Sequence, residues 1–350
     1  METTSVGVIG CGYWGPNLLR NFAENETAQL RWICDLDQAR LASMSRRYPF
    51  AKTALNYRQL LDDDELKAVS IVTPVATHYK IAKQFLRAGK HVLVEKPMTA
   101  TVTEAGELIE LAEQNGLTLM VDHTFIYTGA VRKMKELIDS GQLGDLLYLD
   151  SVRINLGLFQ RDINVLWDLA PHDLSIMDYL IERQPLGITA LGSCHIESGI
   201  ENIAYLVLLF PDDFIAHFHF NWLAPVKIRR TLIAGSSKMI LYDDIEPTEK
   251  VRVYDKGVTA NRIGDREADY QTLVSYRTGD VWAPKLDSTE ALRYVVADFV
   301  DSIRLKRKPL ADGQSGLRVV RLLTAAQQSI KNGGVAVNLV SHSPHSTVPA

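Results

Sequence analysis

The first 124 residues alternate short apolar runs with amphipathic segments, and this alternation restricts the fold more than any other feature of the sequence. The apolar runs have the length and composition of strands, and they occupy residues 5–10, 30–35, 68–73, 91–96 and 117–122. Between them, apolar side chains recur at helical spacing in residues 16–24, 38–48, 78–89 and 102–116. The pattern predicts a parallel sheet with helices on both faces, and thus an α/β domain at residues 1–124.

The remainder of the chain has a different pattern. After a helix expected at 130–141, strand-type runs follow one another, mostly across short polar turns: 145–155, 187–196, 202–210, 214–223, 228–236, 238–243 and 251–255. This pattern predicts a mostly antiparallel sheet, and two further helices are expected at 289–306 and 316–331. We therefore expect an α+β second domain at 125–340, followed by a disordered tail at 341–350.

Three glycines follow the first predicted strand and precede the first predicted helix. Gly10, Gly12 and Gly15 have the G-x-G-x-x-G spacing, with Tyr13 and Trp14 inside the loop. In this setting glycines permit a tight turn, close approach of the backbone to a pyrophosphate and close helix–strand packing, while the helix N-terminus offers amide donors. The motif predicts a dinucleotide site, and the alternative is a glycine-rich turn without a ligand.

Asp35 ends the second predicted strand, 20 residues after Gly15. A carboxylate at this place accepts hydrogen bonds from the adenosine ribose hydroxyls and repels a 2′-phosphate. We therefore predict NAD as the cofactor, with NADP as the alternative because Arg40 is near.

Other predicted strands end in residues that would border the same cofactor crevice, since ligands of open α/β sheets bind beyond the carboxyl ends of the strands. These residues are Thr73, Pro74, Glu95, Lys96 and Pro97. His78 and His123 also fall near the predicted crevice loops, and the alternative for both is a buried structural histidine.

The stretch "WDLAPHDLSIMDYLI" at 167–181 places Asp168 and His172 in an otherwise apolar run. Pro171 disfavours a helical conformation at the preceding residue, so we expect a helix to begin at or just before Pro171. His172 would then lie in the first turn, where the helix dipole favours a neutral imidazole, and Asp168 would lie just upstream. The two interpretations are a proton-transfer pair and an ordinary helix start.

Several polar residues have weaker claims to a role at the site. Candidates for binding substrate hydroxyls or a phosphate precede the Asp–His pair, although solvated strand residues are the alternative: Arg153, Asn155, Arg161 and Asn164. His217 and His219 share a strand face but lack a third ligand, so we expect no metal site. The acidic residues 61–65 are interpreted as an exposed turn.

The overall composition argues against several classes of protein. A net charge of -4 offers no dense basic face for nucleic acid, and no apolar stretch has the length of a membrane span. Cys11, Cys34 and Cys194 form no C-x-x-C pair and indicate no disulfide framework. Because the N-terminus has the pattern of a buried strand and not that of a signal peptide, we expect a cytoplasmic protein.

The order of the glycine loop, "TPVATH", "EKP" and "WDLAPH" resembles the glucose–fructose oxidoreductase / inositol dehydrogenase (Gfo/Idh/MocA) family over nearly the whole chain. The resemblance implies a Rossmann domain followed by a domain with an open, mostly antiparallel sheet, and a homodimer or homotetramer formed through that sheet. It also implies that Lys96, Asp168 and His172 are the catalytic residues. His172 would take the proton of a secondary hydroxyl during hydride transfer to the nicotinamide, and Lys96 would steady the alkoxide.

The stretches "GVIGCGYWGPNLLRNF" and "LWDLAPHDLSI" are similar to members that act on nucleotide sugars, such as UDP-N-acetylglucosamine 3-dehydrogenases. We therefore expect a small-molecule sugar substrate. Alternative functions are an inositol or free-sugar dehydrogenase, an NAD-dependent glycoside hydrolase and a non-catalytic dinucleotide sensor.

Overall fold

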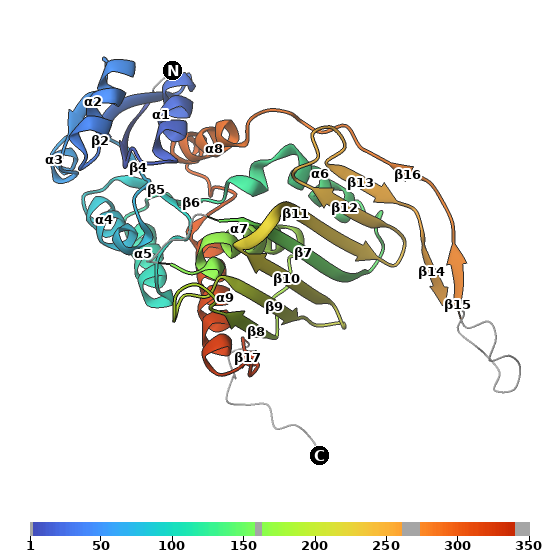
Figure 1. The fold of residues 1–350 in the computed structure, drawn as a ribbon. Helices are drawn as coiled ribbons and strands as arrows, with labels where there is room; N and C mark the ends of the chain where they lie inside the picture. Colours follow the sequence, from blue (N-terminus) through green and yellow to red (C-terminus); the bar gives the residue numbers. More distant parts are fainter. Residues whose placement is uncertain (1–2, 158–162, 261–273, 340–350) are drawn as a thin grey trace, which may run out of the picture. The chain divides into compact units, whose positions relative to one another are not determined.

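A computed structural model describes residues 3–157, 163–260 and 274–339, which form two compact units (Figure 1). The first unit comprises Met1–Thr128 and Ser288–Thr324, and the second comprises Gly129–Asp287 and Ala325–Ala350. The first break thus lies four residues beyond the expected boundary at 124. The sequence analysis did not foresee that residues 288–324 return to the first unit.

The first unit is built on a six-stranded parallel sheet in the order β3-β2-β1-β4-β5-β6. The strands have these bounds: β1 Thr4–Ile9, β2 Ala28–Cys34, β3 Lys52–Ala54, β4 Ala68–Ile71, β5 His91–Glu95 and β6 Leu119–Asp122. Every residue of β1, β4 and β6 is buried, which is the reason that most side chains of these strands are apolar. The strand order reverses direction at β1 and β4, as in dinucleotide-binding sheets.

Helices connect these strands, and their ends follow from local sequence. They are α1 Gly15–Glu24, α2 Gln38–Arg47, α3 Arg58–Leu61, α4 Val75–Arg87, α5 Val102–Gln114 and the 3₁₀ helix η1 Thr124–Tyr127. The side chain of Asp37 caps α2, and Thr101 with Glu104 forms a capping box on α5.

The returning segment contributes α8 Ala291–Leu305 and the first part of α9 Gly313–Lys331 to this unit. Phe22 of α1 packs edge to face on Phe299 of α8, with 6.4 Å between the ring centroids. Tyr127 Oη donates to Asp298 Oδ2 at 2.7 Å. Met120 of β6 also forms a backbone bridge with Asp312. Through these contacts the apolar face of α8 packs against the core of the first unit, which explains why residues 288–324 belong to that unit.

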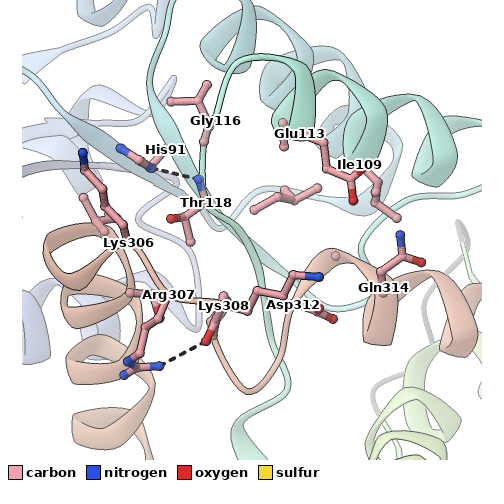
Figure 2. A pocket seen from close by; sticks show the side chains of 17 residues that line it. His91, Ile109, Glu113, Gly116, Thr118, Lys306, Arg307, Lys308, Asp312 and Gln314 are labelled. Atoms are coloured by element: carbon pink, nitrogen blue, oxygen red, sulfur yellow. Dashed lines mark hydrogen bonds between the residues drawn. The ribbon is translucent and has the colours of Figure 1, made fainter.

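A cavity of about 440 Å³ lies at the amino ends of β5 and β6 (Figure 2). His91 begins β5 and lines the cavity, where its Nδ1 accepts a hydrogen bond from the Thr118 amide at 2.9 Å. Burial lowers the pKa of His91 to about 4, so this imidazole is neutral. Since Lys96 follows the carboxyl end of β5, the cavity is at the opposite edge of the sheet from the predicted cofactor crevice.

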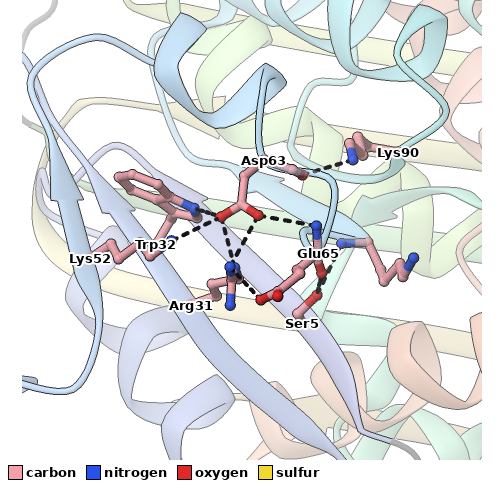
Figure 3. A network of polar contacts seen from close by, with 8 residues as sticks. Ser5, Arg31, Trp32, Lys52, Asp63, Glu65 and Lys90 are labelled. Carbon is pink, nitrogen blue, oxygen red and sulfur yellow. Dashed lines mark hydrogen bonds and ion pairs between the residues drawn. The ribbon is translucent and has the colours of Figure 1, made fainter.

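The interpretation of residues 61–65 as an exposed acidic turn holds for Asp62, Asp64 and Glu65, but Asp63 is the centre of a polar network (Figure 3). Only 9% of its side chain is exposed. Its carboxylate accepts from Arg31 Nε at 2.7 Å, from Trp32 Nε1 at 2.6 Å and from the Glu65 amide at 3.1 Å. The bond with the Arg31 guanidinium is the main reason that the pKa of Asp63 is far below its ordinary value.

The second unit contains a nine-stranded open sheet in the order β16-β13-β12-β11-β7-β10-β9-β8-β17. Only the pair β7–β10 is parallel, and the other pairs are antiparallel. The bounds are β7 Leu146–Leu156, β8 Gly187–Ser193, β9 Ile203–Leu209, β10 Ile215–Asn221, β11 Leu223–Gly235, β12 Met239–Asp243, β13 Val251–Tyr254, β16 Val281–Trp282 and β17 Val337–Asn338. The fold class predicted from the sequence is confirmed in both units. A separate hairpin pairs β14 Gly257–Ala260 with β15 Val274–Arg277.

The two faces of this sheet differ. Burial alternates along β9 and β10, and the buried side chains face α7 Val165–Leu180, with α6 Gly129–Asp139 packed on α7. The other face exposes apolar side chains on three adjacent strands, namely Leu191, Tyr205, Leu209 and Ile215. In the described part of the chain, no helix combines the length and hydropathy needed to span a membrane.

Candidate active site

The glycine loop turns the chain from β1 into α1, and its three glycines have different surroundings. Gly10 has a φ of +105°, which L-residues avoid, and a Cβ on Gly15 would overlap the Gly10 carbonyl oxygen. At Gly12 the atom nearest to such a Cβ is Arg40 Nη1 at 3.8 Å. The protein itself therefore leaves the space at Gly12 open, as an approaching pyrophosphate requires.

Asp35 lies one residue beyond β2, beside this loop. Its Oδ2 accepts from the Cys11 amide at 2.5 Å and its Oδ1 accepts from the Asp37 amide at 2.7 Å. Each carboxylate oxygen can accept a second bond, so the group is oriented by the backbone and can still receive ribose hydroxyls. The Arg40 side chain is 57% exposed and pairs with Asp37 at 3.5 Å.

Thr73 and Pro74 lie between β4 and α4, and His78 lies one turn into that helix. Thr73 Oγ1 is 2.7 Å from Thr77 Oγ1. His78 is buried, with Nε2 2.6 Å from the Thr73 carbonyl oxygen and Nδ1 3.0 Å from that of Pro97. Burial is the main reason that the pKa of His78 is lowered. His78 thus lies between two crevice loops, with one ring nitrogen near a carbonyl oxygen of each, and does not present an exposed imidazole.

Glu95 and Lys96 follow one another at the end of β5, and the Lys96–Pro97 peptide is cis. Glu95 pairs in register with Asp122 at the end of β6. Burial raises the pKa of Glu95 well above its ordinary value, and the nearby Asp122 carboxylate raises it further.

His123 follows Asp122 and is buried, and neither of its ring nitrogens has a hydrogen-bond partner among the described residues. Burial, with a smaller contribution from the nearby Lys96 cation, lowers the pKa of His123 to about 3. This imidazole is therefore neutral at physiological pH. Of the two aromatic residues in the glycine loop, Tyr13 is 92% exposed, whereas Trp14 Nε1 donates to Asp122 Oδ2 at 3.2 Å.

Asp168 and His172 lie within α7, which begins at Val165 and not near Pro171 as expected. Asn164 caps the helix by accepting from the Trp167 amide at 3.1 Å. Asp168 is therefore in the first turn and His172 is one turn further, beyond the residues on which the helix dipole acts most strongly. The spacing of four residues puts both side chains on one face of α7, and both are half-buried.

Trp222 fixes the position of Asp168, and the sequence analysis did not identify it. Its Nε1 donates to Asp168 Oδ2 at 3.1 Å, and the whole side chain is buried. A Cβ on Gly157 would overlap the Trp222 ring. The only signal in the sequence is a tryptophan directly after a strand, in "HFHFNWL".

The predicted substrate-binding residues are mostly engaged elsewhere. Arg153 is buried and forms an ion pair with Asp173, so it holds β7 to α7. The Asn164 side chain caps α7 and also donates to Glu201 at 2.5 Å. Asn155 is half-buried near the end of β7, and Arg161 lies outside the described residues.

No group of three or more potential metal ligands is present among the residues that the structure describes. His217 Nδ1 is 3.6 Å from Asp150 Oδ1, and His219 stacks on Tyr205 at 4.3 Å between ring centroids. The predicted catalytic residues are divided between the units, with Lys96 in the first and the Asp168–His172 pair in the second.

One named relative matches nearly the whole chain in sequence and fold, and another matches about half of the chain. UDP-N-acetylglucosamine 3-dehydrogenase of Acidithiobacillus ferrooxidans is 26% identical over 322 residues, which cover 90% of this chain and 93% of that protein. Its solved structure has a TM-score of 0.79 at 24% identity, with 95% of this chain and 99% of that chain covered. Inositol 2-dehydrogenase 2 of Saccharopolyspora erythraea is 32% identical over 193 residues, 54% of this chain and 57% of that protein.

Two profiles of one protein family match adjacent parts of the sequence. The profile described as "Oxidoreductase family, NAD-binding Rossmann fold" matches residues 4–123. The profile of the "GFO/IDH/MocA C-terminal domain" matches residues 131–241, and together the two cover more than half of the chain. The chain belongs to the Gfo/Idh/MocA family of oxidoreductases, and its N-terminal domain is an NAD-binding Rossmann domain.

Proposed function

We propose that this oxidoreductase uses NAD to oxidise a secondary hydroxyl of a sugar, and that the sugar is nucleotide-linked. The observation that carries the proposal is the built cradle at the glycine loop, with an open space at Gly12 and an oriented carboxylate at Asp35. The similarity to UDP-N-acetylglucosamine 3-dehydrogenase over 90% of this chain supports the choice of substrate class.

The glycine loop and Asp35 would hold the cofactor, and NAD when bound supplies the hydride acceptor. His172 takes the proton of the substrate hydroxyl as a general base. Asp168, four residues earlier on the same face of α7, keeps the imidazole oriented and stabilises the imidazolium. The Lys96 ammonium stabilises the negative charge that develops on the hydroxyl oxygen.

Buried polar groups support this assignment of roles. Trp222 donates to Oδ2 of Asp168 and so orients this carboxylate. The orientation restricts the positions that the His172 imidazole can adopt beside it. The pKa of His123 is lowered to about 3, so this imidazole adds no positive charge beside Lys96.

The exposed apolar face of the second sheet supports a homodimer or homotetramer, which we propose as the assembled state. Leu191, Tyr205, Leu209 and Ile215 expose apolar side chains on one face of β8, β9 and β10. A surface of this kind is typical of an interface.

The test is formation of NADH, followed by absorbance, with NAD and a panel of sugars, cyclitols and UDP-sugars. We expect a UDP-sugar to give NADH with the native protein and with His195→Ala, which removes an exposed histidine, but not with His172→Ala. Equal rates for His172→Ala and the native protein would exclude His172 as the base. NADH from a cyclitol or a free sugar alone would exclude the nucleotide-linked substrate, and glycoside cleavage without net NADH would identify a hydrolase.

A further inference from the structure

The Trp14 side chain reaches across the carboxyl edge of the Rossmann sheet. Trp14 stands in the glycine loop after β1, and its indole Nε1 donates to Asp122, the last residue of β6, at 3.2 Å. The strand order places β4 and β5 between β1 and β6. Because neighbouring strands are about 4.8 Å apart, β6 lies about 14 Å from β1, and the bond joins the loop that follows β1 to the end of β6.

The acceptor of this bond is held rigidly. Asp122 is 1% exposed, and its Oδ1 accepts from Thr124 Oγ1 at 2.6 Å while Oδ2 accepts from Trp14. Glu95 lies opposite Asp122 in the β5–β6 register. Because each oxygen of the Asp122 carboxylate accepts a hydrogen bond, the group cannot turn without breaking them.

The hydrogen bond with Asp122, and not burial of the ring, determines the orientation of the Trp14 indole. Trp14 is half-buried, and its neighbour Tyr13 in the same loop is 92% exposed. An indole at such a position would find a partner for its N–H in water. The bond with Asp122 instead holds the ring along the edge where an open α/β sheet binds a dinucleotide.

We propose that Asp122 is a positioning residue of the cofactor site, which holds the Trp14 indole as the wall against which the nicotinamide half of the dinucleotide packs. The glycine loop and Asp35 lie at β1 and β2 and serve the pyrophosphate and the adenosine half. The wall extends from the loop toward β6, on the side of Glu95 and Lys96. The inference rests on the cofactor-binding part of the proposed function and not on the identity of the sugar.

The experiment compares two ligands, NADH and ADP-ribose, which share the adenosine and pyrophosphate but differ in the nicotinamide. The dissociation constant of each is measured for the native protein, Trp14→Phe, Asp122→Ala and the double variant. Trp14→Phe keeps an aromatic ring but loses the N–H donor together with the five-membered ring of the indole. Asp122→Asn replaces Asp122→Ala should the latter fail to fold.

We expect each single variant to bind NADH about fivefold more weakly, since an unpinned side chain must be ordered when the ligand binds. The double variant should be no weaker than the singles, because both remove the same interaction. ADP-ribose should bind all variants within twofold of the native protein. Trp32→Phe is the matched control, since it removes an indole bond to a carboxylate, Asp63, in the same unit, and it should bind NADH as the native protein does.

Three results would overturn the inference: native NADH affinity in Trp14→Phe, additive losses in the double variant, or an equal loss for ADP-ribose. The last would mean that the pair shapes the whole loop and not the nicotinamide wall. Failure of the native protein to bind either ligand would instead refute the cofactor-binding part of the proposed function.

Discussion

Replacing Asp63 by Asn should destabilise the first unit by about 3 kcal/mol at neutral pH. The carboxylate accepts two bonds from the Arg31 guanidinium, at 2.7 Å and 3.1 Å, and one from Trp32 Nε1 at 2.6 Å. A hydrogen bond to a charged group contributes about 1.5–3 kcal/mol. Asparagine keeps one acceptor oxygen but turns an NH₂ group toward donors, so we count the loss of two charge-assisted bonds at the lower end of this range.

The effect should depend on pH with a definite sign. The pKa of Asp63 is lowered in the folded protein, chiefly by the Arg31 bond, so the carboxylate stabilises the fold above the ordinary carboxyl pKa of about 4. That contribution is lost progressively as the pH falls below this value. The difference in stability between the native protein and Asp63→Asn should therefore be constant from pH 5 to pH 7 and should shrink toward pH 3.

Urea unfolding followed by tryptophan fluorescence at pH 7, 5 and 3 measures this difference. The transition whose midpoint changes in Asp63→Asn is assigned to the first unit. Asp64→Asn is the control, since Asp64 is the exposed neighbour in the same acidic turn. A difference below about 1 kcal/mol at pH 7, or one that does not shrink in acid, would refute the reasoning that the network depends on the charge of Asp63.

Three further predictions concern the site. Trp222→Phe should lower kcat about tenfold and leave the dissociation constant of NADH unchanged, because Asp168 loses its indole donor; unchanged kcat would separate Trp222 from catalysis. Asp35→Ser should shift the ratio of kcat/KM values from NAD toward NADP, and an unchanged ratio would show that the carboxylate does not meet the ribose. Gly15→Ala should abolish NADH binding and lower Tm, since its Cβ would overlap the Gly10 carbonyl; native binding in a calorimetric titration would contradict the packing argument.

The sheet of each unit could be predicted because strand and helix periods are local properties of the sequence. The helix boundary in α7 could not, because the residues from Val165 onward are apolar on several faces and give no periodic signal. Pro171 suggested a start, yet a proline can stand inside a helix when burial compensates for the lost backbone bond. Asn164 was the true signal, and its capping role was hidden because an asparagine before a predicted site is equally a ligand candidate.

The return of α8 to the first unit also lies beyond sequence patterns. An amphipathic helix shows that one face is buried and not which core covers it. The Phe22–Phe299 contact joins residues that are far apart in the chain, and nothing local to either residue indicates the other. The same limit applies to Arg153. Its charge suggested a substrate-binding residue, but in the structure it forms a buried ion pair with Asp173.

Among the described residues, three tryptophans donate to carboxylates, and the consequence of each bond depends on the position of the carboxylate. Trp32 donates to Asp63 within the polar network of the first unit, where the bond serves stability. Trp222 donates to Asp168 on α7 and Trp14 donates to Asp122 at the edge of the cofactor sheet, where orientation matters more than stability. The same substitution, Trp to Phe, should therefore lower stability in the first case, kcat in the second and NADH affinity in the third, so the three variants separate structural, catalytic and cofactor-binding roles with one chemical change.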